Sequence, residues 1–218
     1  MATVTDSPSG NLSGKMGRIV YYEIDGKNYA RQAPHARTKA QKEAVSELSK
    51  LNQSKMRLAQ KYLKPLKKVI QFGYQELATG ARRPFHACLS QTLNQAFEAD
   101  GRAHKLSPAL LKVSSGSLMP PFEAKATRVE DGILLTWTEH SWVGNAKPWD
   151  RAFVVIHHPE DEFCDWVSYG KSREEGKMLF PLPESQRSRT WHVYLAFSRE
   201  NSRTKKTQLS DSVYLGRV

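Results

Sequence analysis

Several features that mark membrane, secreted or disulfide-bonded proteins are scarce in this sequence of 218 residues. No run approaches the roughly 18 apolar residues of a membrane helix, and the polar N-terminus lacks the basic-then-apolar pattern of a signal peptide. Only two cysteines occur, Cys88 and Cys164, in segments of opposite character, so we expect ordinary thiols rather than a disulfide. These absences favour a cytoplasmic protein.

The spacings that nucleotide binding and catalysis require are missing as well. The stretch SGNLSGKMG looks like a phosphate-binding loop, but only three residues separate Gly10 from Gly14, and Met16 stands where that loop needs Ser or Thr. The segment 157–165 is rich in possible metal ligands, but adjacent histidines on a strand point to opposite faces. We therefore expect an exposed acidic loop there, no metal, no cofactor and no catalytic residues, and the sequence predicts a protein that is not an enzyme.

Negative charge is scarce in one half of the chain. Residues 1–112 contain 19 Lys and Arg against 8 Asp and Glu, whereas residues 113–218 contain 14 of each kind. The whole net charge of +11 therefore belongs to the first half. Such asymmetry predicts two regions with different roles, one of which faces an acidic partner.

The first structured element predicted by the sequence is a β-hairpin. Two β-like runs, 18–24 and 27–31, flank Asp25-Gly26, a dipeptide that favours a type I′ turn because both central residues of that turn need positive φ. Residues 1–13 are rich in Ser, Gly and Asn, which is typical of a flexible arm. Because a lone hairpin is only marginally stable, we expect it to pack on another element or another chain.

Apolar residues at helical spacing follow the hairpin. The predicted helices cover residues 38–64, 65–78 and 85–99. Thr38 is a suitable N-cap for the first, Pro65 separates the first from the second, and the third places Phe97 on its apolar side. Helices with one apolar stripe bury it against each other, so we expect a small helical layer.

The last hundred residues have the pattern of a β-sandwich. The candidate strands are 122–129, 133–138, 152–158, 163–169, 178–182, 190–198 and 208–215. Seven short, regularly spaced strands are typical of the immunoglobulin or fibronectin type III kind, and the lack of a suitably placed cysteine pair favours the fibronectin-like version. Pro181 restricts its strand to an edge, and Trp137 is expected between the sheets with Tyr194 as its neighbour.

The predicted fold class is therefore α+β. An N-terminal arm, hairpin and basic helical region occupy residues 1–112, and a fibronectin-like sandwich occupies residues 113–218. Four stretches resemble an uncharacterised family of unknown function seen mainly in the Bacteroidota: LSGKMGRIVY, GKNYAR followed by Pro34, YLKPLKKVIQFGY and the late SDSVYLG. The resemblance covers nearly the whole chain, supports this architecture and carries no established activity.

The basic helical segment is the leading candidate for a binding surface. Ten Lys and Arg lie between Arg37 and Lys68, against Glu43 and Glu47, and they largely avoid the apolar stripe. They predict a cationic surface able to contact phosphates, although a solvated helix face is the commoner reason for such a pattern. The candidate phosphate contacts are Lys55, Arg57, Lys61, Lys64, Lys67 and Lys68.

The hairpin offers a second candidate surface that mixes basic and aromatic residues. Its candidate interaction residues are Lys15, Arg18, Tyr21, Tyr22, Lys27, Tyr29 and Arg31. Such a mixture suits nucleic acid, or an exposed edge to which a strand of another subunit adds.

These observations predict a structural or interaction protein rather than an enzyme. In this interpretation the hairpin engages another protein subunit, of the same or a different kind, and a phage- or prophage-derived assembly is one concrete version. The alternative is a nucleic-acid-binding accessory protein that uses the basic half. Neither interpretation involves a membrane, and the expected location is the cytoplasm or a virion-like particle.

Overall fold

The computed structural model describes residues 2–4, 13–24, 26–36, 38–40, 44–79, 83–100, 103–201 and 205–218. Contacts divide the chain into two compact units. The first consists of Met1–Lys50 with Thr79–Ala81, and the second of Leu51–Ala78 with Arg82–Val218. Most of the predicted helical layer thus falls in the same unit as the β-rich half, because the two share a core.

The first unit is an antiparallel sheet with the strand order β1-β4-β3-β2. Its strands are β1 (Ala2–Val4), β2 (Gly14–Met16), β3 (Ile19–Ile24) and β4 (Lys27–Gln32). The predicted hairpin is present as β3 and β4, with Gly26 at a φ of +76°, while Asp25 lies outside the described residues. The N-terminal residues predicted as a flexible arm contribute β1, and 5–12 lie outside the described residues.

The stretch that looks like a phosphate loop is part of this sheet. Gly14 begins β2 with a φ of +121°, and Gly17 forms the turn into β3 with a φ of +59°. Both angles belong to the region that favours glycine, because a Cβ would be strained there. The glycines therefore shape an entry into a β-sheet.

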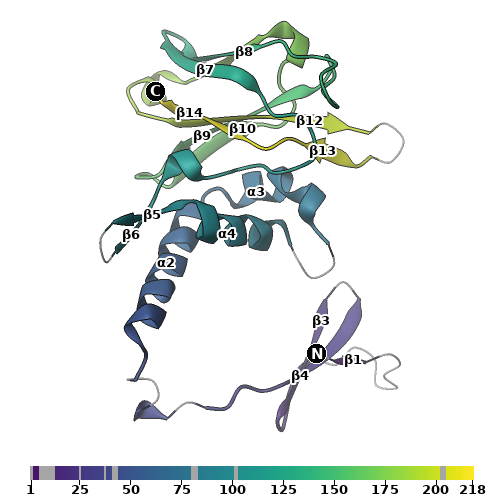
Figure 1. Cartoon of the computed structure of the whole chain (residues 1–218), viewed down its shortest axis with the longest axis vertical. Helices are drawn as coiled ribbons and strands as arrows, with labels where there is room; N and C mark the ends of the chain where they lie inside the picture. The colour runs from purple at the N-terminus through teal and green to yellow at the C-terminus, as the bar shows by residue number, and fades with distance from the viewer. Residues whose placement is uncertain are drawn as a thin grey trace. The chain divides into compact units, whose positions relative to one another are not determined.

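The second unit has three layers, which Figure 1 shows from the top downwards as a sheet, a second sheet and a group of helices. The first sheet has the order β11-β8-β7 and the second the order β10-β9-β12-β13, with β14 also paired to β12. Its strands are β7 (Phe122–Val129), β8 (Gly132–Thr138), β9 (Arg151–His158), β10 (Phe163–Val167), β11 (Lys177–Pro181), β12 (His192–Glu200), β13 (Thr207–Leu209) and β14 (Val213–Arg217). The strand with Pro181 lies at a sheet edge, as predicted.

Two hydrophobic clusters fill the spaces between these layers. One lies between the two sheets and contains Trp137, Val154 and Phe197, and the other lies between the second sheet and the helices and contains Val155 and Tyr194. Successive residues of β9 and β12 enter opposite clusters, because side chains alternate along a strand. The expected pairing of Trp137 with Tyr194 is therefore wrong: the Trp137 ring packs on Phe197, 5.7 Å between centroids.

The helices are shorter than the sequence predicts. Those of the predicted helical layer are α2 (Glu47–Leu63), α3 (Lys67–Gly73) and α4 (Pro84–Gln95), with a 3-10 turn η1 (Gln75–Leu77) after α3. A further short helix, α5 (Glu184–Arg187), lies between β11 and β12. The prediction that one helix runs from Thr38 is wrong, because residues 44–46 are not helical and the Ser46 hydroxyl accepts a hydrogen bond from the Ser49 amide. Ser46 therefore occupies the N-cap position.

Two further boundaries differ from the sequence prediction. Phe97 is not helical but opens β5 (Phe97–Asp100), which pairs with β6 (Ala103–Leu106). The last predicted strand is two strands, β13 and β14, because side chains interrupt the backbone pairing between them. The Phe197 amide of β12 donates to Ser210 Oγ, and Ser212 Oγ accepts from the Val113 amide.

A buried ion cluster holds one end of the two packed sheets. The Asp150 carboxylate is fully buried and accepts hydrogen bonds from Arg173 Nε at 3.2 Å and Arg199 Nε at 2.6 Å. Arg173 also lies over the Phe197 ring, 3.8 Å from its centroid, and its carbonyl accepts from Trp137 Nε1. These charges are paired and hydrogen-bonded, as burial requires.

Candidate functional site

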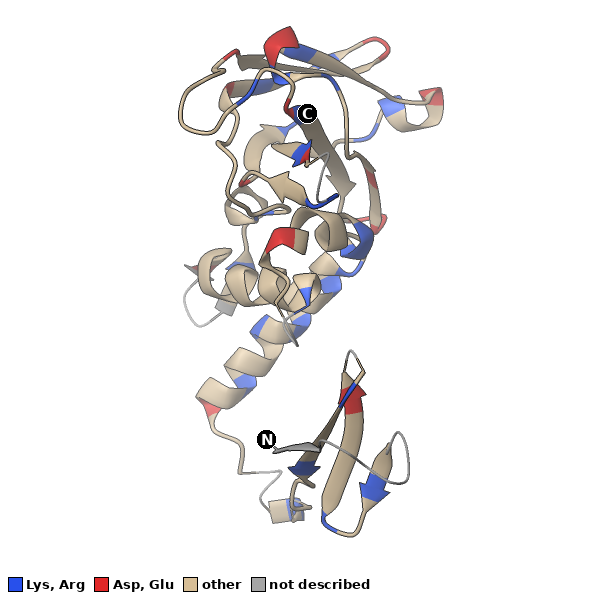
Figure 2. Cartoon of the chain, turned by 90° about the vertical axis from the view of Figure 1, so that its right-hand side faces the viewer, with Lys and Arg blue, Asp and Glu red and all other residues tan. Residues whose placement is uncertain are grey.

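Lys and Arg residues follow successive turns of α2 in the second unit, and Figure 2 colours their positions on the ribbon blue. Arg57, Lys61 and Lys64 are spaced i, i+4 and i+7, and the Lys64 amide continues the helical pattern by bonding the Gln60 carbonyl. Residues at this spacing share one helix face. The sequence therefore places three cations side by side.

These three cations line a groove of about 800 Å³, the basic groove, with Lys67 of α3. Arg83, the residue before α4, adds a fifth cation to the wall, and Glu162 adds a carboxylate. The other lining residues are Gln60, Gln71, Pro84, Phe85 and His86. A concave surface rich in one sign of charge focuses its field on ligands of the opposite sign.

Of the six candidate phosphate contacts, four therefore converge and two do not. Lys55 lies over the Phe97 ring, with Nζ 5.0 Å from the ring centroid, and is not part of the groove wall. Lys68 is exposed on α3 and is also outside the wall. The two provide natural controls for the groove.

An apolar cavity of about 380 Å³ adjoins the basic groove, since Lys61 and Glu162 line both. Its wall contains Leu58, Tyr62 and Pro65 from the α2 end, His104, Lys105 and Leu106 from β6, and His157 and Pro159 from the end of β9. Sequence reasoning missed this cavity, because its residues come from segments far apart in the chain.

His157 is the chemically unusual residue of this cavity. Its side chain is fully buried, and neither ring nitrogen has a hydrogen-bond partner among the residues that the structure describes. Burial, together with smaller contributions from the neighbouring His192 and His158, lowers the pKa of His157 to about 4. The imidazole is therefore neutral near pH 7, with one nitrogen a donor and the other an acceptor.

The candidate residues of the hairpin do not all share one face. The register pairs Lys15 with Val20, Val20 with Arg31 and Tyr22 with Tyr29, so these side chains lie on one face together with Lys27, the partner of Ile24. The Tyr22 and Tyr29 rings stack at 5.6 Å, and Arg31 lies 5.9 Å from the Tyr22 centroid. We call this the basic–aromatic face.

The two remaining hairpin candidates lie elsewhere on the sheet. Tyr21 is next to Tyr22 in β3 and so occupies the opposite face. Arg18 lies in the turn before β3 and, with Lys15, lines a small hollow of about 170 Å³ beside residues 32–36. The sequence alone did not show how these residues divide between the faces of the sheet.

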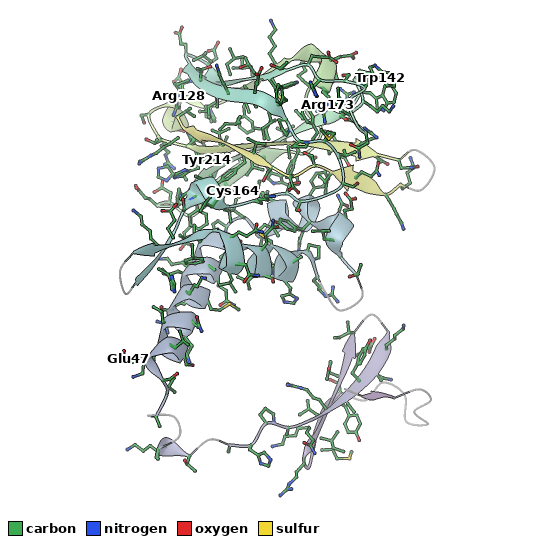
Figure 3. The ribbon with its side chains drawn as sticks, in the orientation of Figure 1. Glu47, Arg128, Trp142, Cys164, Arg173 and Tyr214 are labelled. Carbon is green, nitrogen blue, oxygen red and sulfur yellow. The ribbon has the colours of Figure 1, made fainter. Side chains whose placement is uncertain are left out.

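An exposed tryptophan pair was also missed by the sequence reasoning. Trp142 and Trp149 are 63% and 54% exposed and meet edge to face at 5.7 Å, and Figure 3 shows Trp142 projecting outwards from the end of the two packed sheets. Trp142 has a φ of +70°, and Lys147 Nζ lies 4.0 Å from its ring centroid. A bulky residue in this backbone region is uncommon and marks a position worth testing.

The cysteines and the possible metal ligands form no reactive site among the described residues. Both cysteines are free, and burial raises the pKa of Cys88 to about 11, so its thiol is not activated. Within the described ranges, no group of three or more His, Cys, Asp and Glu side chains is placed to hold a metal ion. No helix in those ranges is both long enough and apolar enough to cross a membrane.

The structure thus defines an α+β protein, mostly β, with a basic groove beside an apolar cavity. The chain belongs to a family whose model is described as "Family of unknown function (DUF6266)" and matches residues 11–216. No curated protein and no solved structure matches the chain. Function must therefore be argued from the surfaces described above.

Proposed function

We propose that this protein is a non-enzymatic subunit of a larger assembly and that its N-terminal sheet holds it to a neighbouring subunit. One observation carries the proposal: in the Met1–Lys50 unit, none of the residues whose burial the structure describes is buried. An isolated small sheet is marginal in water without a hydrophobic face packed on another element. The surface of a neighbouring subunit supplies that burial.

The charge of the sheet selects the kind of surface it meets. Residues 13–40 contain six Lys and Arg against two carboxylates, Glu23 and Asp25. Two such sheets repel each other, whereas the turn after β9 exposes Glu160 and Glu162, which make no ion pair with a described residue. A contact between the basic–aromatic face and this acidic turn of the next copy is head-to-tail, which builds rings or filaments.

The proposal includes a finer assignment of the fold and of the setting. Labelled in chain order as A, B, C, C′, E, F and G, the strands from β7 onwards give sheets A-B-E and C′-C-F-G, with β13 and β14 sharing the last position. This order supports a fibronectin type III-like module, which suits binding or spacing between partners. A phage- or prophage-derived particle is one assembly in which such a subunit would serve.

Sedimentation velocity over a range of protein concentrations tests the proposal. We expect species larger than the 24.7 kDa chain, with dissociation by salt and by the double substitution Lys27→Glu and Arg31→Glu. Charge reversal at Glu160 and Glu162 should have the same effect, and mixing the two reversed variants should restore association. Lys68→Glu is the matched control, and a chain that stays monomeric throughout would contradict self-assembly.

A second function, binding of nucleic acid, is favoured by a separate observation. Five Lys and Arg side chains converge on the basic groove, which lies in the other unit from the N-terminal sheet. Phosphate contacts of this kind are independent of sequence and weaken with salt.

A salt titration with a fluorescent oligonucleotide measures this second function. For single strands, the logarithm of the binding constant should fall against the logarithm of salt concentration with a slope of about −0.7 for each phosphate contacted. Lys64→Glu with Lys67→Glu should weaken binding and flatten the slope, whereas Lys55→Glu with Lys68→Glu should change neither as much. Equal losses of affinity from the two double substitutions would contradict a role of the basic groove in nucleic-acid binding.

A further inference from the structure

The strongest unexplained feature of the second unit is a histidine in the wall of the apolar cavity. Neither ring nitrogen of His157 has a hydrogen-bond partner among the residues that the structure describes. The Tyr62 ring meets the His157 ring edge to face, 4.8 Å between centroids. The Tyr62 hydroxyl interacts instead with the Tyr194 hydroxyl, which donates to the Pro108 carbonyl at 2.9 Å.

Buried polar atoms that have no partner among the described residues favour a partner from outside the chain. A buried donor or acceptor without a hydrogen bond costs about 1–3 kcal/mol, so such groups are rare in folded proteins. A few ordered waters occupy only about 30 Å³ each, whereas the cavity measures about 380 Å³ and has Leu58, Pro65, Leu106 and Pro159 in its wall. This volume lies in the range of about 300–1,000 Å³ that is usual for ligand sites.

The shape and chemistry of the cavity suit a flat ring. The Tyr62 ring and two prolines offer apolar surface, and the neutral imidazole of His157 offers one donor and one acceptor. Nucleobases carry donors and acceptors on their edges and apolar faces suited to stacking on aromatic side chains. The ring of such a ligand would be held by shape and by hydrogen bonds to His157.

The position of Lys61 indicates that the ligand also carries an anionic group. Lys61 lines both the apolar cavity and the basic groove, so a ring in the cavity places its substituent beside the cations of the groove. A ring joined to a phosphate matches both parts at once. In single-stranded nucleic acid the following phosphates would continue along Arg57, Lys64 and Lys67.

We propose that the cavity lined by Tyr62 and His157 binds an aromatic ring that carries a phosphate, with the phosphate in the basic groove. This proposal deepens the second function proposed above and rests on it where the ligand is a strand. A free nucleotide and a nucleotide within a single strand share this chemistry. A base paired in a duplex cannot enter the cavity, so the proposal also predicts preference for single strands.

Fluorescence anisotropy of the full chain tests the proposal with three probes of equal length: a single strand, an abasic single strand and a duplex. We expect the single strand to bind about tenfold more tightly than the abasic strand, because stacking of one base contributes about 1–3 kcal/mol. Leu58→Trp should fill the cavity mouth and remove that difference. Leu48→Trp is the matched control, since both leucines are exposed on α2 and Leu48 is outside the cavity wall.

The outcomes separate the cavity from the groove. Equal, salt-dependent binding of the single and abasic strands would overturn the cavity proposal and leave the groove standing. If no strand binds even at low salt, the groove function fails, and saturation-transfer NMR with adenosine monophosphate then tests the free nucleotide alone. Binding that Leu58→Trp abolishes and Leu48→Trp does not would support a free-nucleotide site, and absence of binding would overturn the proposal.

His157→Phe provides a second variant in case Leu58→Trp disturbs folding. It keeps an aromatic side chain and removes both polar atoms. We expect it to weaken binding of the base-containing single strand and to leave binding of the abasic strand unchanged. A thermal melt checks that the variant folds. Equal losses for both strands would mean that His157 has no contact with a ring.

Discussion

The N-terminal sheet and the five-stranded sheet of the second unit are both antiparallel, yet their surroundings are opposite. In β9, six consecutive residues are buried, and they fill a cluster on each face of the sheet. In β3 and β4 no residue is buried. The comparison teaches that hydrogen-bonded strands alone do not make a stable unit, and that burial on both faces distinguishes the five-stranded sheet from the N-terminal sheet.

Among the substitutions that test this comparison, loss of the buried carboxylate of Asp150 should change the free energy of unfolding most. Asp150→Ala leaves Arg173 buried without its ion pair, and removal of one partner from such a pair typically costs about 3–5 kcal/mol. We expect a corresponding fall in the free energy of unfolding in urea. An effect below about 1 kcal/mol would mean that this end of the two packed sheets is not rigidly buried.

A smaller effect, dependent on pH, concerns His157. Its pKa is about 4 in the folded protein, against about 6.5 for an ordinary histidine, so between these values the unfolded chain binds a proton that the folded chain does not. Stability should therefore fall as the pH falls from 6.5 to 4, by up to about 3 kcal/mol.

The same pH series on His157→Phe isolates the contribution of this side chain. The variant keeps His158 and His192, and its stability should depend less steeply on pH in that window. Because it also removes two unpartnered polar atoms, it should melt higher than the natural protein at pH 5. Identical pH profiles would show that His157 is solvated or paired in solution.

The smallest effect is expected in the N-terminal sheet. Tyr29→Ala removes the stack with Tyr22, but neither ring is buried, and such surface substitutions usually change stability by less than about 0.5 kcal/mol. Its effect should fall on association, measured by sedimentation, and not on urea unfolding of the dissociated chain. If Tyr29→Ala lowered the free energy of unfolding by about 2 kcal/mol or more, the N-terminal sheet would have a core of its own. The contrast between the two sheets would then be contradicted.

Local patterns predicted the strands well, because the alternation of apolar and polar residues in a strand is visible within a few residues. Apolar alternation with intervening turns predicted the strands of the β-rich half to within two residues at each end. The last predicted strand is the exception, because the hydroxyls of Ser210 and Ser212 accept hydrogen bonds from backbone amides there. The same reasoning extended a helix over Phe97, since its spacing fits a helix as well as the β-strand that it joins. The spacing of apolar residues along the chain does not show which neighbours each side chain will pack against.

The candidate surfaces were predictable in composition and not in geometry. Charge spacing on α2 predicted a cationic face, but the contribution of Arg83 depends on how α4 packs beside it. The cavity around His157 joins α2, β6 and β9, which are separated by tens of residues, so no local pattern could indicate it. Only the register of β3 and β4 shows that Tyr21 leaves the face that Tyr22 and Tyr29 share.

The central claim, that the N-terminal sheet is completed by another copy of the chain, is tested most directly by its mass in solution. Sedimentation equilibrium from micromolar to millimolar protein at low salt measures it without a partner or a ligand. The account predicts a mass that rises with concentration to multiples of 24.7 kDa and returns to one chain with Lys27→Glu and Arg31→Glu. A mass of 24.7 kDa at every concentration would contradict it.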